Sequence, residues 1–113
     1  MSGGEKGSTS SCKALESTLK TIFKKKNWDF DENAPLKRLM ETAFSHELLP
    51  RFLEAEFTGL RVILESGVGT VRNKAGGHGA GEKKRLVPKE IAAFQLHQTA
   101  AAIKLCVDSA KLT

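Results

Sequence analysis

The segment SSCKALESTLKTIFKKKN, residues 10–27, decides the fold class. Ser10 or Ser11 is a good N-cap, the closing lysines suit the negative end of a helix dipole, and Asn27 can adopt the left-handed stop. Between these ends the apolar residues recur every three or four positions, which places them on one face of a helix. They are Cys12, Leu15, Leu19, Ile22 and Phe23. The segment therefore predicts an amphipathic α-helix.

Three further helices follow along the chain. Pro35 suits the first turn of a helix over about residues 35–45. Pro50 begins a third helix, whose apolar stripe starts at Phe52 and continues for about six turns to Val71. Pro88 begins a fourth. Its apolar stripe contains Ile91, Ala92, Gln95, Leu96, Ala100, Ile103, Cys106 and Val107.

The chain shows no sign of strands. No segment keeps a two-residue alternation of apolar and polar residues, and β-branched residues do not cluster. Gly67 and Gly69 fall inside the third helical pattern, where each costs about 1 kcal/mol relative to Ala. The sequence predicts an all-α fold, a four-helix antiparallel bundle with long third and fourth helices.

Length and composition indicate one globular domain. The chain has 113 residues, of which 40% are apolar and 27% charged. We expect residues 1–10 to be a flexible lead or linker remnant and residues 11–113 to form a single helical domain. The opening residues lack the apolar region of a signal peptide, and no apolar run approaches the roughly 18 residues that span a bilayer. Cys12 and Cys106 show no metal-ligand spacing, which indicates reduced thiols and a cytoplasmic protein.

The positive charge is concentrated in one segment. Residues 72–89 contain six basic residues against Glu82 alone, and this balance of +5 equals the net charge of the whole chain. A concentrated positive field attracts phosphates and polyanions. The alternative is a solvated basic loop.

The centre of this segment, VRNKAGGHGAGEKKR at residues 71–85, fits no nucleotide-binding loop. The dinucleotide glycine pattern is absent and no strand is predicted before it. Gly76 and Gly81 have the P-loop spacing, but Glu82 follows where a lysine would bind phosphate. His78 has no metal-ligand partner nearby, so no metal site and no cofactor are expected. No motif for a serine nucleophile is present.

Arg72 and His78 instead suit chemistry on a phosphodiester. We expect Arg72 to follow Val71 at the end of the third helix, where its guanidinium can bind two phosphate oxygens. Asn73 can donate a hydrogen bond, and His78 can exchange a proton near neutral pH. The backbone at three further glycines can approach a ligand closely. These are Gly76, Gly77 and Gly79.

This residue set is sufficient for RNA cleavage without a metal. The ribose 2′-OH attacks the adjacent phosphate, His78 moves a proton and Arg72 stabilises the charge on phosphorus. One histidine per chain serves only one of the two proton transfers, so a symmetric dimer is part of the hypothesis. The alternative is structural: Arg72 and Asn73 cap a helix, His78 is exposed, and the glycines form a turn.

The segment VRNKAGGHGAG resembles the signature of HEPN domains, in which Arg and a polar residue precede His. Here five residues separate Arg72 from His78. More closely, the chain resembles the abortive-infection C-terminal family, a HEPN-like group. The resemblance includes ALESTLK in the first helix, LESGVGTVRN and GGHG in the middle, and VPKEIAAFQLHQTAAAI in the last helix. It covers residues from about Cys12 to Ala110.

The resemblance implies a HEPN-like helical bundle that often forms homodimers and, in active members, a metal-independent endoribonuclease of phage-defence or toxin–antitoxin systems. It carries over Arg72, Asn73 and His78. It further implies that such a domain often ends a longer protein, and that an antitoxin or an additional N-terminal domain is a partner. A non-catalytic nucleic-acid-binding or dimerisation domain is the alternative function.

Further residues have two interpretations each. Glu16 matches a glutamate typical of the family's first helix; it either orients Arg72 or pairs with Lys20. Four basic residues either bind RNA backbone or are solvated charges; they are Lys74, Lys83, Lys84 and Arg85. We expect His97 to be partly buried and His46 to lie on the surface.

Overall fold

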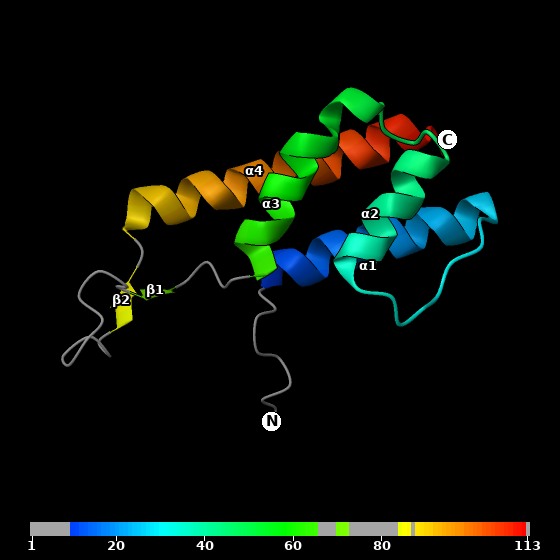
Figure 1. Cartoon of the computed structure of the whole chain (residues 1–113). Helices are drawn as coiled ribbons and strands as arrows, with labels where there is room; N and C mark the ends of the chain where they lie inside the picture. The colour runs from blue at the N-terminus through cyan, green and yellow to red at the C-terminus, as the bar shows by residue number, and fades with distance from the viewer. Residues whose placement is uncertain (1–9, 66–69, 73–83, 87, 113) are drawn as a thin grey trace.

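The computed structural model describes residues 10–65, 70–72, 84–86 and 88–112. The described elements are, in chain order, α1 (Ser10–Lys26), α2 (Leu36–Ser45), the 3₁₀ turn η2 (Arg51–Leu53), α3 (Glu54–Glu65), β1 (Thr70–Arg72), β2 (Lys84–Leu86) and α4 (Lys89–Ala110). Four α-helices make up the body of the protein, which confirms the predicted all-α fold (Figure 1). Two three-residue strands, which the sequence did not predict, form a small hairpin before α4.

Helix α1 is the central element, since it packs against α2, α3 and α4. Its predicted stripe is buried in full: Cys12, Leu15, Leu19, Ile22 and Phe23. Leu36, Leu39, Met40, Ala43 and Phe44 from α2 and Phe57, Leu60 and Leu64 from α3 complete most of the core. The periodicity of the first helix therefore identified its buried face correctly.

The end of α1 has the predicted left-handed stop. Asn27 has φ of 62°, and its N–H donates to the carbonyl of Lys24 at 3.1 Å. The N–H of Trp28 donates to the carbonyl of Phe23 at 2.9 Å, which completes a Schellman motif. Trp28 then stacks on His46 with ring centroids 4.2 Å apart, so the loop after α1 is fixed to the end of α2.

The prediction for the third helix was partly wrong. α3 ends at Glu65, and the predicted continuation to Val71 is replaced by strand β1 from Thr70. The glycines at 67 and 69 weaken a helix, whereas threonine and valine at 70 and 71 favour extended backbone. Phe52, placed in the buried stripe, lies in η2 and is 82% exposed.

Helix α4 begins after Pro88 as predicted, but only part of it is buried. Its buried residues are Thr99, Ala102, Cys106 and Ala110. Ile91, Leu96 and Val107, predicted to face the interior, are exposed, and so is Ala100. A three-to-four-residue period marks an apolar face, but it does not say whether the chain itself covers that face.

Candidate functional site

The hairpin joins the two ends of the basic segment. β1 and β2 are antiparallel, and Arg72 is the register partner of Lys84, while Val71 is the partner of Arg85. Residues 73–83 connect the two strands. The structure therefore brings three of the predicted site residues, Arg72, Lys84 and Arg85, into one short ladder at the start of α4 (Figure 1).

The expected position of Arg72 was wrong in one respect. It lies at the end of a strand rather than at the end of the third helix, because α3 stops at Glu65. The remaining predicted residues of the basic segment lie outside the described residues. These are Asn73, Lys74, Gly76, Gly77, His78, Gly79 and Lys83.

Glu16 lies where α1 meets the end of α3. The Cys12 thiol donates to Glu16 Oε2 at 3.9 Å, and both Glu16 and Glu65 act electrostatically on this thiol. Glu65, the last residue of α3, is held by Arg61 at 2.9 Å. Glu16 thus sits at the end of the bundle from which the chain continues toward β1. Within the described residues Glu16 forms no ion pair with Lys20.

Both cysteines are buried, reduced thiols rather than nucleophiles. Burial, together with the negative charges of Glu16 and Glu65, raises the pKa of the Cys12 thiol to about 11. Burial alone raises the pKa of the Cys106 thiol to about 11. A thiol with such a pKa is protonated at neutral pH and does not attack substrates or bind metals readily.

The two described histidines lie outside the hairpin. His46 is exposed at the end of α2, as predicted, and one face of its ring lies on Trp28. His97 is exposed on α4, so the prediction that it is partly buried was wrong. The residues that share a face of α4 with His97 are themselves exposed, so no core covers the histidine.

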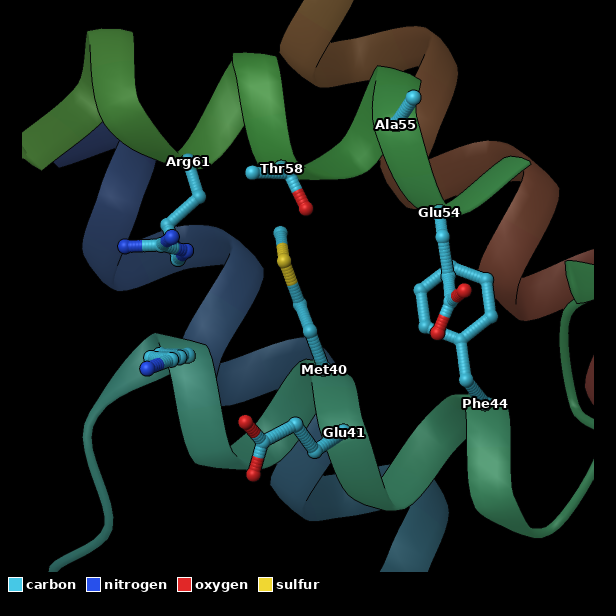
Figure 2. A pocket seen from close by; sticks show the side chains of 8 residues that line it. Met40, Glu41, Phe44, Glu54, Ala55, Thr58 and Arg61 are labelled. Carbon is cyan, nitrogen blue, oxygen red and sulfur yellow. The ribbon is translucent and has the colours of Figure 1, made fainter. Parts of the chain in front are cut away.

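A groove between α2 and α3 was not predicted. It has a volume of about 450 Å³, with Met40 and Phe44 forming an apolar floor. Figure 2 shows Arg61 reaching from α3 and Glu41 from α2 toward the same opening, with Glu54 in front of Phe44. In the sequence, Lys37 directly follows the buried Leu36, and Glu41 directly follows the buried Met40. This pairing of a buried residue with a charged one is the sequence signal for the charged rim of the groove.

The rim of this groove has both signs of charge. Glu54 pairs with Arg51 at 2.9 Å and Glu41 with Arg38 at 3.5 Å, and these pairs are exposed. Exposed ion pairs contribute little to stability. The groove can hold an apolar group flanked by polar ones.

Across residues 10–65 and 88–112 and the two strands, no three His, Cys, Asp or Glu side chains gather in a way that would hold a metal ion. Among the same residues, no helix has the length and apolar character needed to cross a bilayer.

The comparisons with known proteins give one match. No curated protein and no solved structure matches the chain. A family model described as a HEPN-like domain, Abi_C, matches residues 5–110, which is nearly the whole sequence and includes all four helices and the hairpin. This match over nearly the whole sequence shows that the chain belongs to the Abi_C family of HEPN-like domains.

Proposed function

We propose that this HEPN-like domain is a metal-independent endoribonuclease of a phage-defence or toxin–antitoxin system, acting in the cytoplasm. The observation that carries the proposal is the register of the hairpin, which pairs Arg72 with Lys84 and places Arg85 one position further on. Three cationic residues in one ladder give the positive potential that an RNA backbone seeks. The ends of the segment that carries His78 are held at this ladder.

The chemistry follows from the residue types. The 2′-OH of the ribose forms a bond to phosphorus as the bond from phosphorus to O5′ breaks, leaving a 2′,3′-cyclic phosphate and a 5′-OH. One His78 accepts the 2′-OH proton, and the His78 of a second chain donates a proton to O5′. Arg72, with Asn73 as an additional donor, stabilises the negative charge on the phosphoryl oxygens. Because the nucleophile belongs to the substrate, the reaction requires no cofactor.

The other basic residues bind rather than react. Lys84 and Arg85 in β2, with Lys74 and Lys83 on the connecting segment, neutralise phosphates on either side of the cleaved bond. The backbone at Gly76, Gly77 and Gly79 lets the RNA approach closely. Glu16, on α1, orients Arg72.

A second function is favoured by a separate observation. Much of α4 exposes apolar side chains, which suits the dimerisation form of the alternative function, a non-catalytic dimerisation or nucleic-acid-binding domain of a longer abortive-infection protein, regulated by a partner such as an antitoxin. The two functions differ in what happens to bound RNA.

Cleavage in the presence of EDTA separates them. A 5′-labelled RNA is incubated with the wild-type chain and with Arg72→Ala and His78→Ala. We expect cleavage by the wild type, a loss of at least about a hundredfold in each variant, and none of DNA. Arg38→Ala and His97→Ala are matched controls, because both residues are exposed and outside the hairpin. Salt-sensitive RNA binding without cleavage would support the binding function instead.

A further inference from the structure

The α2–α3 groove has the size of a small-molecule site. Its volume of about 450 Å³ falls within the range of about 300 to 1,000 Å³ that such sites occupy. Met40 and Phe44 give it an apolar floor, and its described lining includes no residue of the basic segment. A ligand of this groove can therefore bind whether or not the chain cuts RNA.

The groove has two different ends, because the helices that form it run antiparallel. Figure 2 shows Met40 of α2 opposite Thr58 of α3 at the middle of the groove. Arg61 lies at one end and Phe44 at the other. Lys37 precedes Met40 by about one turn of α2, on the side away from Phe44, so it belongs to the Arg61 end. Two cationic side chains therefore line one end of the groove, and an aromatic ring lines the other.

The charges at the cationic end do not cancel. Arg61 pairs with Glu65 at 2.9 Å, and Glu41 pairs with Arg38 at 3.5 Å. Among the described residues Lys37 forms no ion pair, although it lines the groove. These five side chains together have one positive charge in excess. An anionic group is therefore attracted to this end.

Arg61 has hydrogen-bond donors that its ion pair does not use. Its Nη1 donates to Glu65 Oε1, and this is its only hydrogen bond among the described residues. The pair holds the guanidinium in one orientation, while the remaining N–H groups can bind a carboxylate. The side chain is only 18% exposed, and partial shielding from water strengthens its attraction for an anion.

At the opposite end the charges do cancel. Glu54 lies in front of Phe44 and pairs with Arg51 at 2.9 Å. A cationic ligand group gains little there, because the carboxylate already has a partner. The groove therefore suits a ligand with an anionic head at the Arg61 end and an apolar tail that extends toward Phe44.

We propose that the α2–α3 groove binds a small carboxylate with one apolar tail, in the manner of a medium-chain fatty acid. The carboxylate contacts Lys37 and Arg61, and the tail lies over Met40 and Phe44. Lys37 and Phe44 are seven positions, about 10 Å, apart along α2. The extended chain of octanoate matches this span, so octanoate is the probe.

A second groove serves as an internal comparison. It lies between α3 and α4, has a volume of about 300 Å³ and has mainly apolar residues in its described lining. The one charged residue in that described lining is Glu56, which repels a carboxylate. An uncharged apolar ligand should enter either groove, whereas a carboxylate should select the groove between α2 and α3.

Amide chemical shifts of the isotope-labelled full chain locate the ligand and measure its affinity. Octanoate, octanamide and octylamine are compared, because their tails are alike and their head groups are anionic, neutral and cationic. Octanoate should shift the amides around Met40 and Thr58 rather than those around Leu105 of the second groove, with a dissociation constant on the order of 1 mM. Octanamide should bind about tenfold more weakly in the α2–α3 groove, and octylamine more weakly still.

Two substitutions at exposed positions test the head and the tail separately. Lys37→Gln should weaken octanoate about three- to fivefold, the size of an exposed charge contact, and leave octanamide unchanged. Its matched control is Lys25→Gln, at an exposed lysine of α1 outside the groove. Thr58→Trp fills the middle of the groove and should abolish the binding of both ligands there. Thr21→Trp, which places the same ring on an exposed position of α1, should have no effect.

Several results would overturn the proposal. They are equal affinity for octanoate and octanamide, tighter binding of octylamine, octanoate shifts confined to the second groove, and unchanged octanoate binding in Thr58→Trp. Circular dichroism shows whether each variant is folded. Should Thr58→Trp not fold, an equal effect of Lys37→Gln on octanoate and octanamide would still refute the contact between Lys37 and the carboxylate.

Discussion

Truncation of Leu19 to alanine removes a side chain that is 1% exposed at the centre of α1, the helix that contacts α2, α3 and α4. The three lost carbon atoms correspond to about 2.4 kcal/mol of transfer free energy at about 0.8 kcal/mol per methylene. Leu19 belongs to the main cluster of buried residues, so the cavity cannot close fully. The expected loss in the free energy of unfolding is therefore about 3 to 4 kcal/mol.

The control for this substitution is Leu96→Ala, the same change at a position that is 57% exposed. Both positions are helical, so helix propensity cancels, and the control should stay within about 0.5 kcal/mol of the wild type. Unfolding in urea, followed by circular dichroism at a concentration where the chain is monomeric, measures both.

Thermal unfolding gives a second scale. With an unfolding entropy of about 2.1 cal/mol/K per residue for 113 residues, Leu19→Ala should lower Tm by about 13 to 17 °C. Equal losses in the two variants would refute the assignment of α1 as the core helix and of α4 as an outward-facing one.

Three further predictions follow from other contacts. Cys12 and Cys106, with their pKa raised to about 11, should resist a thiol reagent at pH 8 until the chain unfolds. Because the folded state retains these protons after the unfolded state has lost them, the free energy of unfolding should fall by about 1.4 kcal/mol per pH unit per thiol between pH 9 and 11. The variant Cys106→Ala should show a smaller fall over the same pH range. Asn27 has φ of 62°, so Asn27→Gly should be tolerated while Asn27→Val should cost about 1 to 2 kcal/mol in urea unfolding. Removal of the ring that covers Trp28, in His46→Ala, should shift the emission of this sole tryptophan to longer wavelength, whereas unchanged emission would contradict the stacking.

The parts of the fold that sequence predicts well are those that local rules determine. α1 has a stripe, a cationic last turn and an asparagine stop, and each of these signals agrees with the others. α3 is the contrary case. Its apolar pattern continues through the valines at 68 and 71, but the glycines on either side of Val68 oppose a helix and the pairing of β1 with β2 competes for the backbone. Strand pairing between residues 12 to 16 positions apart leaves no periodic signal.

The exposed half of α4 shows a different limit. Periodicity predicted Ile91 and Leu96 to be buried, because it detects an apolar face and not the molecule that covers it. The basic segment shows the same limit of prediction from sequence. Its charge and its Arg and His residues were evident from the sequence, yet the register that joins Arg72 to Lys84 depends on how the strands pair. The α2–α3 groove, formed by side chains from two helices, required the packing of those helices.

Mixing wild-type and His78→Ala chains tests the central claim, that two copies supply one phosphodiester with the groups that cut it. Equal amounts are combined at constant total concentration, and the rate of RNA cleavage in EDTA is compared with that of the wild type alone. If each cleavage uses a histidine from both chains, only the wild-type homodimers are active, and the rate should fall to about one quarter. A rate of about one half would show that each chain acts by itself, and no cleavage by the wild type would contradict the ribonuclease.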